Sequence, residues 1–343
     1  MAHGARPVRP KMQRLNPAER LAQASGAAGN GAARSGAPKS GPPRKGPAKV
    51  KPATAADWVS GARLRTLPLA IAPVALGTGA AIVATGPGVF YPERALLALV
   101  VALCLQIGVN YANDYSDGVR GTDAHRVGPA RLTGSGAARP AVVLSVALAF
   151  FALAALAGLA LVLMTQQWWL LLVGAAAIGA AWLYTGGKKP YGYFGLGELF
   201  VFVFFGLVAT LGTTYVQAGT INTESWLGAV GIGLVACAVL MVNNLRDRET
   251  DKKAGKRTLA VLIGNVASRV VFCVFLLAPF GIALFFTIFY PLAYFTFFVL
   301  LLALPACLIT VTAKTSRELI LALQLTSLAA LGYGVLLGLA FAL

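Results

Sequence analysis

Nine long apolar segments follow one another along the chain from residue 66 onward, and they limit its fold more than any other feature. A helix needs about 20 mostly apolar residues to cross a bilayer. Only 12% of the 343 residues are charged, which is too little to cover the surface of a soluble domain of this length. The sequence therefore predicts an all-α integral membrane protein with nine transmembrane helices. The predicted spans are residues 66–85, 94–113, 141–163, 167–185, 195–216, 225–245, 269–289, 291–312 and 318–341.

The first 54 residues differ from the rest of the chain. They carry eleven Lys or Arg against one acid, Glu19, and they are rich in Gly, Pro and Ala. Such a segment buries too little apolar surface to offset the entropy of ordering it, so we expect a disordered basic tail over 1–54 and a membrane domain over 55–343. A solvated extension is the favoured interpretation, and contact with anionic lipid head groups is the alternative. No apolar stretch follows the early positive charges, so the tail does not have the pattern of a signal peptide.

The basic residues between the predicted spans fall almost entirely on one side. Seventeen Lys or Arg lie in the loops on the side of the tail, and one, Arg94, lies in the loops on the other side. Positive loops remain in the cytoplasm. The sequence therefore predicts a multi-pass protein of the plasma membrane with a cytoplasmic N-terminus and an external C-terminus.

The sequence disfavours metal sites built from histidine or cysteine, disulfides, and Ser-His-Asp catalysis. The chain has two histidines, His3 and His125, and four cysteines, none in a C-x-x-C pair and all inside apolar runs. We therefore interpret the cysteines as packing residues within the membrane.

Polar side chains inside apolar spans are costly, and they recur here at helical spacing. In the second span they follow one helical face toward the cytoplasm, and two glycines then lead to Asp123. The sixth span ends in the same way, on the same side of the membrane. The first set is Gln106, Asn110, Asn113, Asp114 and Asp117, and the second is Asn243, Asp247 and Asp251.

These two regions hold six of the eleven acids outside the tail, interleaved with Lys and Arg. Carboxylates stacked at helical spacing repel one another unless a cation lies between them. One such loop would be interpreted as a solvated surface with salt bridges, but two acidic faces on the same side favour a shared site. Oxygen ligands without His or Cys are typical of Mg²⁺, which binds one or two carboxylates together with substrate phosphates. Neighbouring Arg and Lys would then bind the phosphate oxygens.

Five stretches of the chain resemble a known family. The two aspartate-rich segments, 113–117 with Asp123 and 243–251, are similar to those of the UbiA superfamily of intramembrane prenyltransferases. Three further stretches resemble its 1,4-dihydroxy-2-naphthoate polyprenyltransferases, the MenA family: GARLRTLP at 61–68, YTGGKKPYGY at 184–193 and GKRTLA at 255–260. The resemblance covers about residues 57–343 and leaves out the tail.

The resemblance implies nine helices around a central cavity, two Mg²⁺ ions (Mn²⁺ being the alternative) and a lipid tail in an apolar tunnel open to the bilayer. The metal ligands, direct or through water, would be Asp114, Asp117, Asp123, Asp247 and Asp251, with neutral oxygens from Asn113 and Asn243. The expected catalytic residues are Asp117, Asp247, Arg257, Lys188 and Tyr184. The expected substrate-binding residues are Asn113, Asn243, Arg63, Arg65, Arg126, Arg131, Lys189, Tyr191, Lys253 and Lys256.

The implied activity is Mg²⁺-dependent transfer of a polyprenyl group from polyprenyl diphosphate to 1,4-dihydroxy-2-naphthoate, with loss of carbon dioxide, to give demethylmenaquinol for menaquinone biosynthesis. Arg257, Lys188 or Lys189 would bind the aromatic carboxylate, and the rings of Tyr184 and Tyr191 would stabilise the allylic cation. Glu198 is expected to pair with Lys188 or Lys189, or else to accept a proton.

Two alternatives remain. The first is a superfamily member with another acceptor, such as 4-hydroxybenzoate, homogentisate, a porphyrinoid or a sugar phosphate. The second is an ion-coupled transporter, which is disfavoured because transporter sites usually lie at mid-membrane and not at one face. The expected partners are the two substrates and the lipid bilayer, without nucleic acid. Oligomeric state and isoprenoid length stay open.

Overall fold

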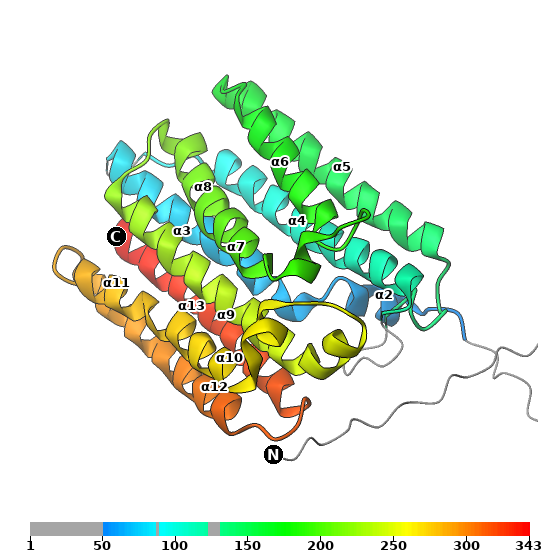
Figure 1. Cartoon of the computed structure of the whole chain (residues 1–343). Coiled ribbons are helices and arrows are strands. Elements are labelled where there is room, and N and C mark those ends of the chain that lie inside the picture. The colour runs from blue at the N-terminus through cyan, green and yellow to red at the C-terminus, as the bar shows by residue number, and fades with distance from the viewer. Residues whose placement is uncertain (1–50, 87–88, 123–130) are drawn as a thin grey trace, which may run out of the picture. The chain divides into compact units, whose positions relative to one another are not determined.

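The computed structural model describes residues 51–86, 89–122 and 131–343, and its regular structure over these residues is helical. Residues 1–50, most of the predicted tail, lie outside the described residues. The elements are α2 (Ala55–Gly61), η1 (Leu64–Thr66), α3 (Pro68–Thr85), α4 (Pro92–Arg120), α5 (Pro140–Thr165), α6 (Leu170–Leu183), η2 (Tyr191–Phe194), α7 (Gly197–Val201), η3 (Phe202–Val208), α8 (Ala209–Ala218), α9 (Thr223–Lys253), α10 (Leu259–Leu277), α11 (Pro279–Phe286), η4 (Pro291–Val299), α12 (Leu300–Thr312) and α13 (Glu318–Ala342) (Figure 1).

The all-α membrane class is confirmed. Within the described residues, eight helical segments are long and apolar enough to cross a membrane, with α7–η3–α8, α10–α11 and η4–α12 each counted as one segment. The remaining predicted span, 167–185, contains α6, an apolar helix of 14 residues. At 1.5 Å per residue α6 is about 21 Å long, which is shorter than the roughly 30 Å hydrocarbon core. The count of nine spans and the orientation of the termini stay predictions.

Local sequence signals account for where several helices begin. Proline, whose fixed φ suits the first helical turn, starts α3, α4, α5 and α11. Asn222 begins α9 with a capping box in which its side chain accepts a hydrogen bond from the Ser225 backbone N–H. These signals are local, and most observed helices begin within a few residues of the predicted spans; α10 is the exception, since it begins at Leu259 and the predicted span at 269.

The helix carrying the second acidic face is longer than the predicted span. The sequence predicts a span that ends at residue 245 and a charged loop that runs to residue 269. In the structure α9 continues to Lys253, and α10 already begins at Leu259. Lys252 and Lys253 in the last turn favour this extension because cations stabilise a helix C-terminus. As a result the acidic residues stay on one continuous helix.

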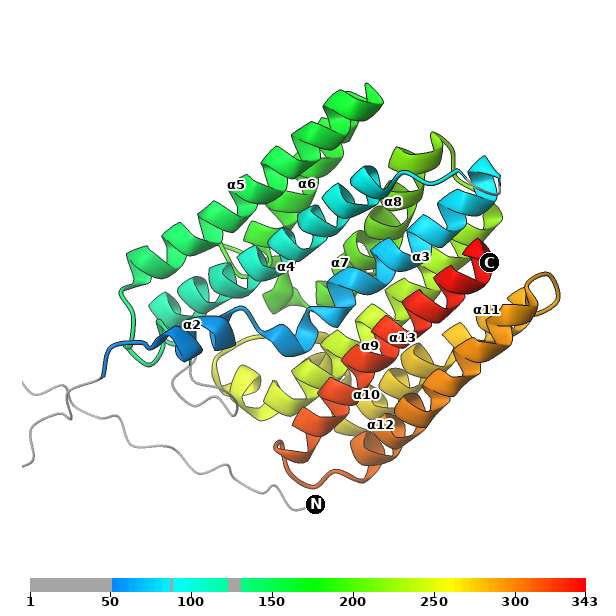
Figure 2. The same cartoon turned by 180° about the vertical axis from the view of Figure 1, so that it is seen from behind.

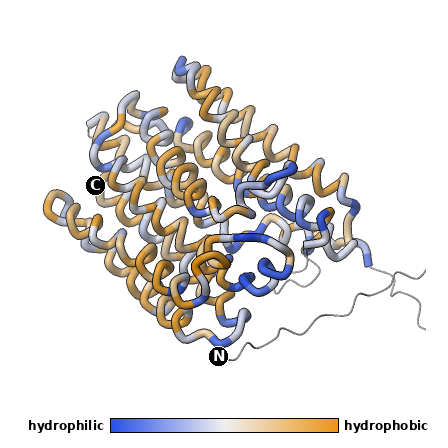
Figure 3. Tube along the Cα trace, viewed as in Figure 1, coloured by the Kyte–Doolittle hydropathy of each residue, from blue (hydrophilic) through white to orange (hydrophobic). Residues whose placement is uncertain are grey.

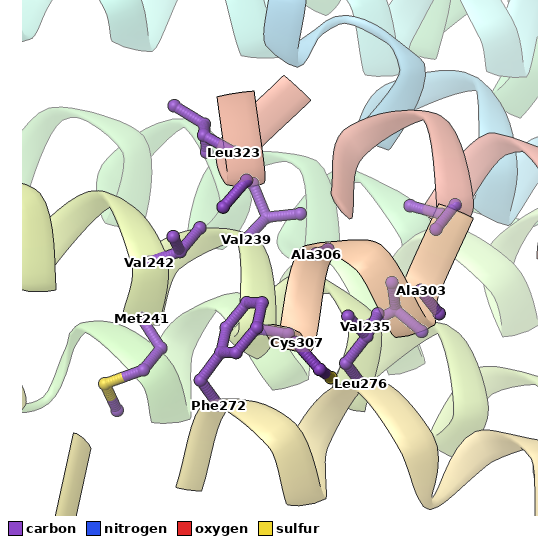
Figure 4. Close-up of a cluster of buried hydrophobic side chains, with 14 of the residues drawn as sticks. Val235, Val239, Met241, Val242, Phe272, Leu276, Ala303, Ala306, Cys307 and Leu323 are labelled. Carbon is purple, nitrogen blue, oxygen red and sulfur yellow. The ribbon is translucent and has the colours of Figure 1, made fainter. Parts of the chain in front are cut away.

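Helix α9 forms the centre of the membrane domain, and apolar side chains pack around its length. One large cluster joins α9 to α10, α12 and α13 (Figure 4). Its labelled members are Val235, Val239, Met241, Val242, Phe272, Leu276, Ala303, Ala306, Cys307 and Leu323. In Figure 3 the helices are mainly hydrophobic along their lengths, and hydrophilic residues gather near the α9–α10 connection and the C-terminal end of α4.

The seam between α3 and α13 is closed by backbone contact. A Cβ built on Gly79 would overlap the Gly338 carbonyl, and one on Gly334 would overlap the Ala72 carbonyl. Small residues of this kind let helices approach closely where lipid provides no hydrophobic driving force. In Figures 1 and 2 these helices run alongside α9, while α5 and α6 form an edge of the domain. Ala180 is the buried residue of α6, so this helix is loosely packed.

Candidate active site

A cavity of about 570 Å³ lies among α3, α4, α5, α6, η3, α8 and α9. The C-terminal part of α4 and of α9 give it a polar end, and most of its remaining lining is apolar. Ten of the predicted site residues line the cavity: Arg63, Asn113, Asp117, Arg131, Tyr184, Tyr191, Asn243, Asp247, Asp251 and Lys256. The two acidic helix ends therefore face one cavity.

Asp117 is the most strongly held of these acids. Its carboxylate is 2% exposed, and it pairs with Lys256 Nζ at 3.0 Å and Arg131 Nη1 at 3.3 Å. The Tyr193 hydroxyl donates to its Oδ1 at 2.6 Å. Burying a carboxylate is costly unless it is paired and hydrogen-bonded. Three donors from three separate segments of the chain therefore stabilise one negative charge at the cavity wall.

Tyr193, in the short helix η2, links this carboxylate to one of its cations. Lys256 Nζ lies 4.7 Å from the centre of the Tyr193 ring, a cation–π distance. Burial, together with the neighbouring Asp117 charge, raises the pKa of Tyr193. The phenol therefore keeps its proton and remains a hydrogen-bond donor at neutral pH.

On α9 the corresponding acid is Asp247, which forms a two-point ion pair with the preceding residue. Arg246 Nε donates to Oδ1 at 2.7 Å and Nη2 to Oδ2 at 2.6 Å. Arg246 Nη2 also donates to Asn243 Oδ1 at 2.9 Å. A planar guanidinium suits this fork geometry, so Arg246 fixes both oxygen-bearing side chains.

Asp114 has a different role from the one predicted. Its two carboxylate oxygens accept from the backbone N–H groups of Leu132 and Thr133, at 2.9 and 2.8 Å, and it does not line the cavity. These bonds hold the segment that places Arg131 at Asp117. Its expected contact with metal stays a prediction that the geometry does not favour.

The predicted basic loop after α6 is held at its backbone. Arg120 donates to the carbonyls of Thr185 and Gly187, and the Thr185 hydroxyl donates to Asn113 Oδ1 at 2.6 Å. Gly187 has a φ of +74°, a conformation that favours glycine. The loop thereby turns Lys188 and Lys189 outward, where both are exposed.

Two tyrosines of this loop do line the cavity. The Tyr184 and Tyr191 rings lie 5.5 Å apart in an edge-to-face arrangement, and Tyr191 stacks on Phe200 at 3.9 Å. Gly192 is required here because a Cβ would meet the Tyr184 carbonyl oxygen at 2.6 Å. The pair gives the cavity an aromatic wall near its polar end.

Several predicted residues are not brought to the cavity. Arg65, Lys188, Lys189, Lys253 and Arg257 are exposed and absent from its lining. Their predicted contacts with substrate are therefore not supported by the geometry. Asp123 and Arg126 lie outside the described residues, so their predicted roles remain predictions.

Four residues of the site were missed from the sequence: Thr185, Tyr193, Asn244 and Arg246. The expected pairing of Glu198 with Lys188 or Lys189 is wrong, because Glu198 is buried on α7 and its Oε1 accepts from Asn244 Nδ2 at 3.0 Å. A signal for Arg246 existed, since it directly precedes Asp247 within an otherwise buried helix. Nothing in the sequence indicated that Tyr193 would reach Asp117, 76 positions away.

The donors at the polar end fit a hard divalent cation. Asp117, Asp247 and Asp251 offer carboxylates, and Asn113 and Asn243 offer amide oxygens. Within the described residues no three His, Cys, Asp or Glu side chains form a ready metal-binding group. Each ion would therefore rely on one or two carboxylates, with amides, water and a substrate phosphate completing its ligands, as Mg²⁺ commonly does.

The fold and this site define a class: helical membrane enzymes that act on an anionic head group joined to an apolar chain. The model of the UbiA prenyltransferase family matches residues 70–319. The chain belongs to the UbiA prenyltransferase family.

Individual relatives agree with this assignment. The chain is 50% identical over 293 residues to the 1,4-dihydroxy-2-naphthoate octaprenyltransferase of Mycobacterium tuberculosis, covering 81% of this chain and 94% of that protein. It is 41% identical over 218 residues to the enzyme of the same name from Escherichia coli, covering 62% and 70%.

Solved structures share the fold. A UbiA homolog from Aeropyrum pernix superimposes with a TM-score of 0.60 at 15% identity, covering 78% of this chain and 96% of that one. A UbiA homolog from Archaeoglobus fulgidus, solved with GPP and Mg²⁺, gives 0.52 at 15% identity, covering 82% and 99%.

Proposed function

We propose that this protein transfers a polyprenyl group from polyprenyl diphosphate to 1,4-dihydroxy-2-naphthoate, releasing carbon dioxide and giving demethylmenaquinol for menaquinone biosynthesis. The observation that carries the proposal is the single cavity whose polar end combines Asp117 and Asp247 with buried cations, while its other walls are apolar. High identity to named naphthoate prenyltransferases over most of their length supports the choice of acceptor.

The polar end would receive the diphosphate. Mg²⁺ bound there would supply positive charge that stabilises the departing pyrophosphate. Lys256 and Arg131 now neutralise Asp117. With a divalent cation held at Asp117, Lys256 and Arg131 would be available to bind the phosphate oxygens. Arg246 would remain on Asp247 and hold it in orientation.

The reaction then breaks the allylic C–O bond, and its electron pair leaves with pyrophosphate. The electron-rich ring attacks the allylic carbon, a C–C bond forms, and the ring carboxylate departs as carbon dioxide, so that charge balances without a separate base. Tyr184 and Tyr191 line this region, where aromatic rings would stabilise a cation. Apolar walls exclude water that would otherwise quench it.

Arg63 is the proposed partner of the acceptor carboxylate. It lines the cavity, in contrast to Arg257, Lys188 and Lys189, to which the sequence assigned this role. Its backbone φ is +56°, a left-handed conformation that is uncommon for a residue with a side chain. Gln106 donates to Thr66 and Asn110 donates to the Ala62 carbonyl, so α4 anchors both sides of this turn.

The metal and the membrane orientation belong to the same proposal. Mg²⁺ is the proposed ion because all-oxygen donors with a substrate phosphate are typical of Mg²⁺ sites, and Mn²⁺, which accepts the same donors, is the alternative. The basic loops would place the polar end of the cavity at the cytoplasmic face of the plasma membrane.

The deciding experiment incubates the purified full-length protein with Mg²⁺, geranyl diphosphate and, in separate reactions, 1,4-dihydroxy-2-naphthoate, 4-hydroxybenzoate or homogentisate. We expect a naphthoate product whose mass equals the sum of acceptor and prenyl group less carbon dioxide. Preferential prenylation of another acceptor would identify a different branch of the family, and no product with any acceptor would contradict the proposal.

A further inference from the structure

Glu198 is a buried acid that takes no part in the charge balance of the polar end or in the proposed reaction. It lies in the first turn of α7, is 5% exposed and does not line the cavity. Its Oε1 accepts a hydrogen bond from Asn244 Nδ2 at 3.0 Å. Its Oε2 is sealed from solvent and has no hydrogen-bond partner within the described residues. Acids inside membrane spans are costly and usually mark functional sites, which makes the partner Asn244 a candidate functional residue.

Asn244 connects this acid to the cavity. It lies on α9 between Asn243 and Asp247, and all three side chains line the cavity. Its NH₂ group is directed at Glu198, and within the described part of the chain no group donates to its amide oxygen, Oδ1. Asn243 differs, because Arg246 donates to its oxygen. Asn244 therefore presents a hydrogen-bond acceptor whose donor would come from a molecule in the cavity.

Close packing of α7 on α9 fixes the position of the pair. Gly197 directly precedes Glu198, and a Cβ on Gly197 would meet Leu240 Cδ2 at 3.1 Å. The Glu198 backbone carbonyl accepts from Cys237 Sγ at 3.2 Å. Cys237 lies two helical turns before Asn244 on α9, so the two helices are joined at both points. Glu198 therefore holds the Asn244 amide in one orientation.

The chemistry of this acceptor indicates the group that it binds. Phosphate oxygens on a metal ion are themselves acceptors, whereas a phenolic hydroxyl is a donor. The wall beside the pair is aromatic, since a Cβ on Gly197 would also lie 3.4 Å from the Tyr184 ring. In 1,4-dihydroxy-2-naphthoate the 1-hydroxyl adjoins the carboxylate and donates to it internally, so the 4-hydroxyl is the free donor. A ring hydroxyl therefore fits Asn244 better than a phosphate does.

We propose that Glu198 is a positioning residue that holds the Asn244 amide so that its oxygen accepts a hydrogen bond from the 4-hydroxyl of the aromatic acceptor. This inference rests on the proposed function, because it takes the acceptor to be 1,4-dihydroxy-2-naphthoate. A site built to bond a substrate hydroxyl discriminates against analogues that lack it, because its own polar group is then left unpaired. Asn244 is thus a specificity-determining residue.

The hydroxyl contact is tested by binding, which does not require the reaction. Equilibrium binding of 1,4-dihydroxy-2-naphthoate and of 1-hydroxy-2-naphthoate, which lacks only the 4-hydroxyl, is measured without oxygen on the full-length protein with Mg²⁺. We expect the wild type to prefer the dihydroxy compound by about tenfold, the scale of one buried hydrogen bond. Asn244→Leu should bring this affinity ratio close to one.

Variants at Glu198 separate positioning from charge. Glu198→Gln keeps an oxygen acceptor for Asn244 and places its NH₂ group where Oε2 meets no donor, so we expect it to retain the ratio. Glu198→Leu removes the acceptor and should lower the ratio as Asn244→Leu does. The double Leu variant replaces both partners by apolar groups, which costs little stability, so it reports on the contact even where a single variant does not fold.

Gln217→Leu is the matched control, because it removes a buried amide on α8 that does not line the cavity. A wild-type ratio near one, a ratio unchanged in the double variant or an equal change in the control would overturn the proposal. Loss of the ratio in Glu198→Gln would also overturn it, by showing that the charge matters. A changed Mg²⁺ requirement in Asn244→Leu with an unchanged ratio would make Asn244 a metal ligand instead.

Naphthoate transfer by the wild type is measured in parallel to keep the two proposals apart. Absence of transfer together with the expected ratios would reject only the proposed reaction. Transfer by the wild type with ratios that the variants do not change would reject only this role of Glu198 and Asn244.

Discussion

Asp114 and Asp117 show how differently two acids on the same stretch of helix are used. Asp114 accepts two backbone N–H groups and holds the segment at Arg131. Asp117 faces the cavity and is balanced by two cations and the Tyr193 hydroxyl. Asp114 therefore holds a loop segment in place, and Asp117 supplies a carboxylate to the polar end of the cavity, although the two side chains are chemically identical.

Replacing each acid by its amide separates these roles. Asp117→Asn removes the charge that would bind metal, and we expect kcat for prenyl transfer to fall by at least about a hundredfold, the usual scale for losing one electrostatic contact in a transition state.

Asp114→Asn should instead destabilise the fold by about 1–3 kcal/mol, because an NH₂ group then faces a buried backbone donor. For both variants, steady-state kinetics measures kcat and thermal unfolding in detergent measures stability.

The two variants serve as each other's control. Near-normal turnover in Asp117→Asn would remove its assignment at the metal. A catalytic loss in Asp114→Asn without a change in thermal stability would move that carboxylate into the reaction. Either result would require a different division of labour between the two acids.

At the scale of elements, the long helices α4 and α9 matter because each carries its polar residues past the apolar span on one continuous face. A break at the predicted end of α9 would separate Asn243 from Asp251. Helix α6 is short and lines one side of the cavity. At the α3–α13 seam, by contrast, backbone contact leaves no space.

Gly79→Ala tests the importance of that seam. The added Cβ would overlap the Gly338 carbonyl, which belongs to rigid helical backbone, so α3 and α13 must move apart. We expect a loss of about 1–3 kcal/mol in unfolding free energy, typical of overpacking. Gly281→Ala on α11 is the control, because its Cβ meets nothing within 4 Å and Ala favours helix. Equal thermal stability of the two variants would show that the seam is not closely packed.

At the scale of the whole molecule, the buried charges at the polar end compensate one another without a bound ion. Asp117 pairs with Lys256 and Arg131, and Asp247 pairs with Arg246. The apolar cluster around α9 includes Val242 and Leu245, which neighbour Asn243 and Arg246 on the same helix, and Val239 and Leu323, which also line the cavity (Figure 4). Packing of the bundle therefore positions the polar end, while local ion pairs balance its charges.

This charge compensation predicts the effect of removing divalent cations. Chelation with EDTA should abolish prenyl transfer, and added Mg²⁺ should restore it, while helix content by circular dichroism stays unchanged because the carboxylates keep their Lys and Arg partners. Unfolding on chelation would show that the ion holds the helices together. Full activity in EDTA would contradict the proposed metal requirement.

Much of the site was predicted from sequence because its signals are local. Helical spacing identifies the faces of Asn113 with Asp117 and of Asn243 with Asp251, and hydropathy identifies the spans that carry them. Charge alone did not predict which basic residues line the cavity. Lys188, Lys189 and Arg257 resembled ligands in the sequence, but the backbone turns at Gly187 and Gly255 leave them exposed.

By itself the sequence determined the membrane class and which helix faces are acidic, because periodicity and apolar length act within a single helix. It also indicated the family, through the resemblance of five short stretches. Only the tertiary structure decided that Tyr193, Lys256 and Arg131 meet at Asp117, and that Asn244 donates to Glu198. Those contacts join residues far apart in the chain. They depend on how closely helices approach one another, which is set by backbone and side-chain packing that no local pattern records.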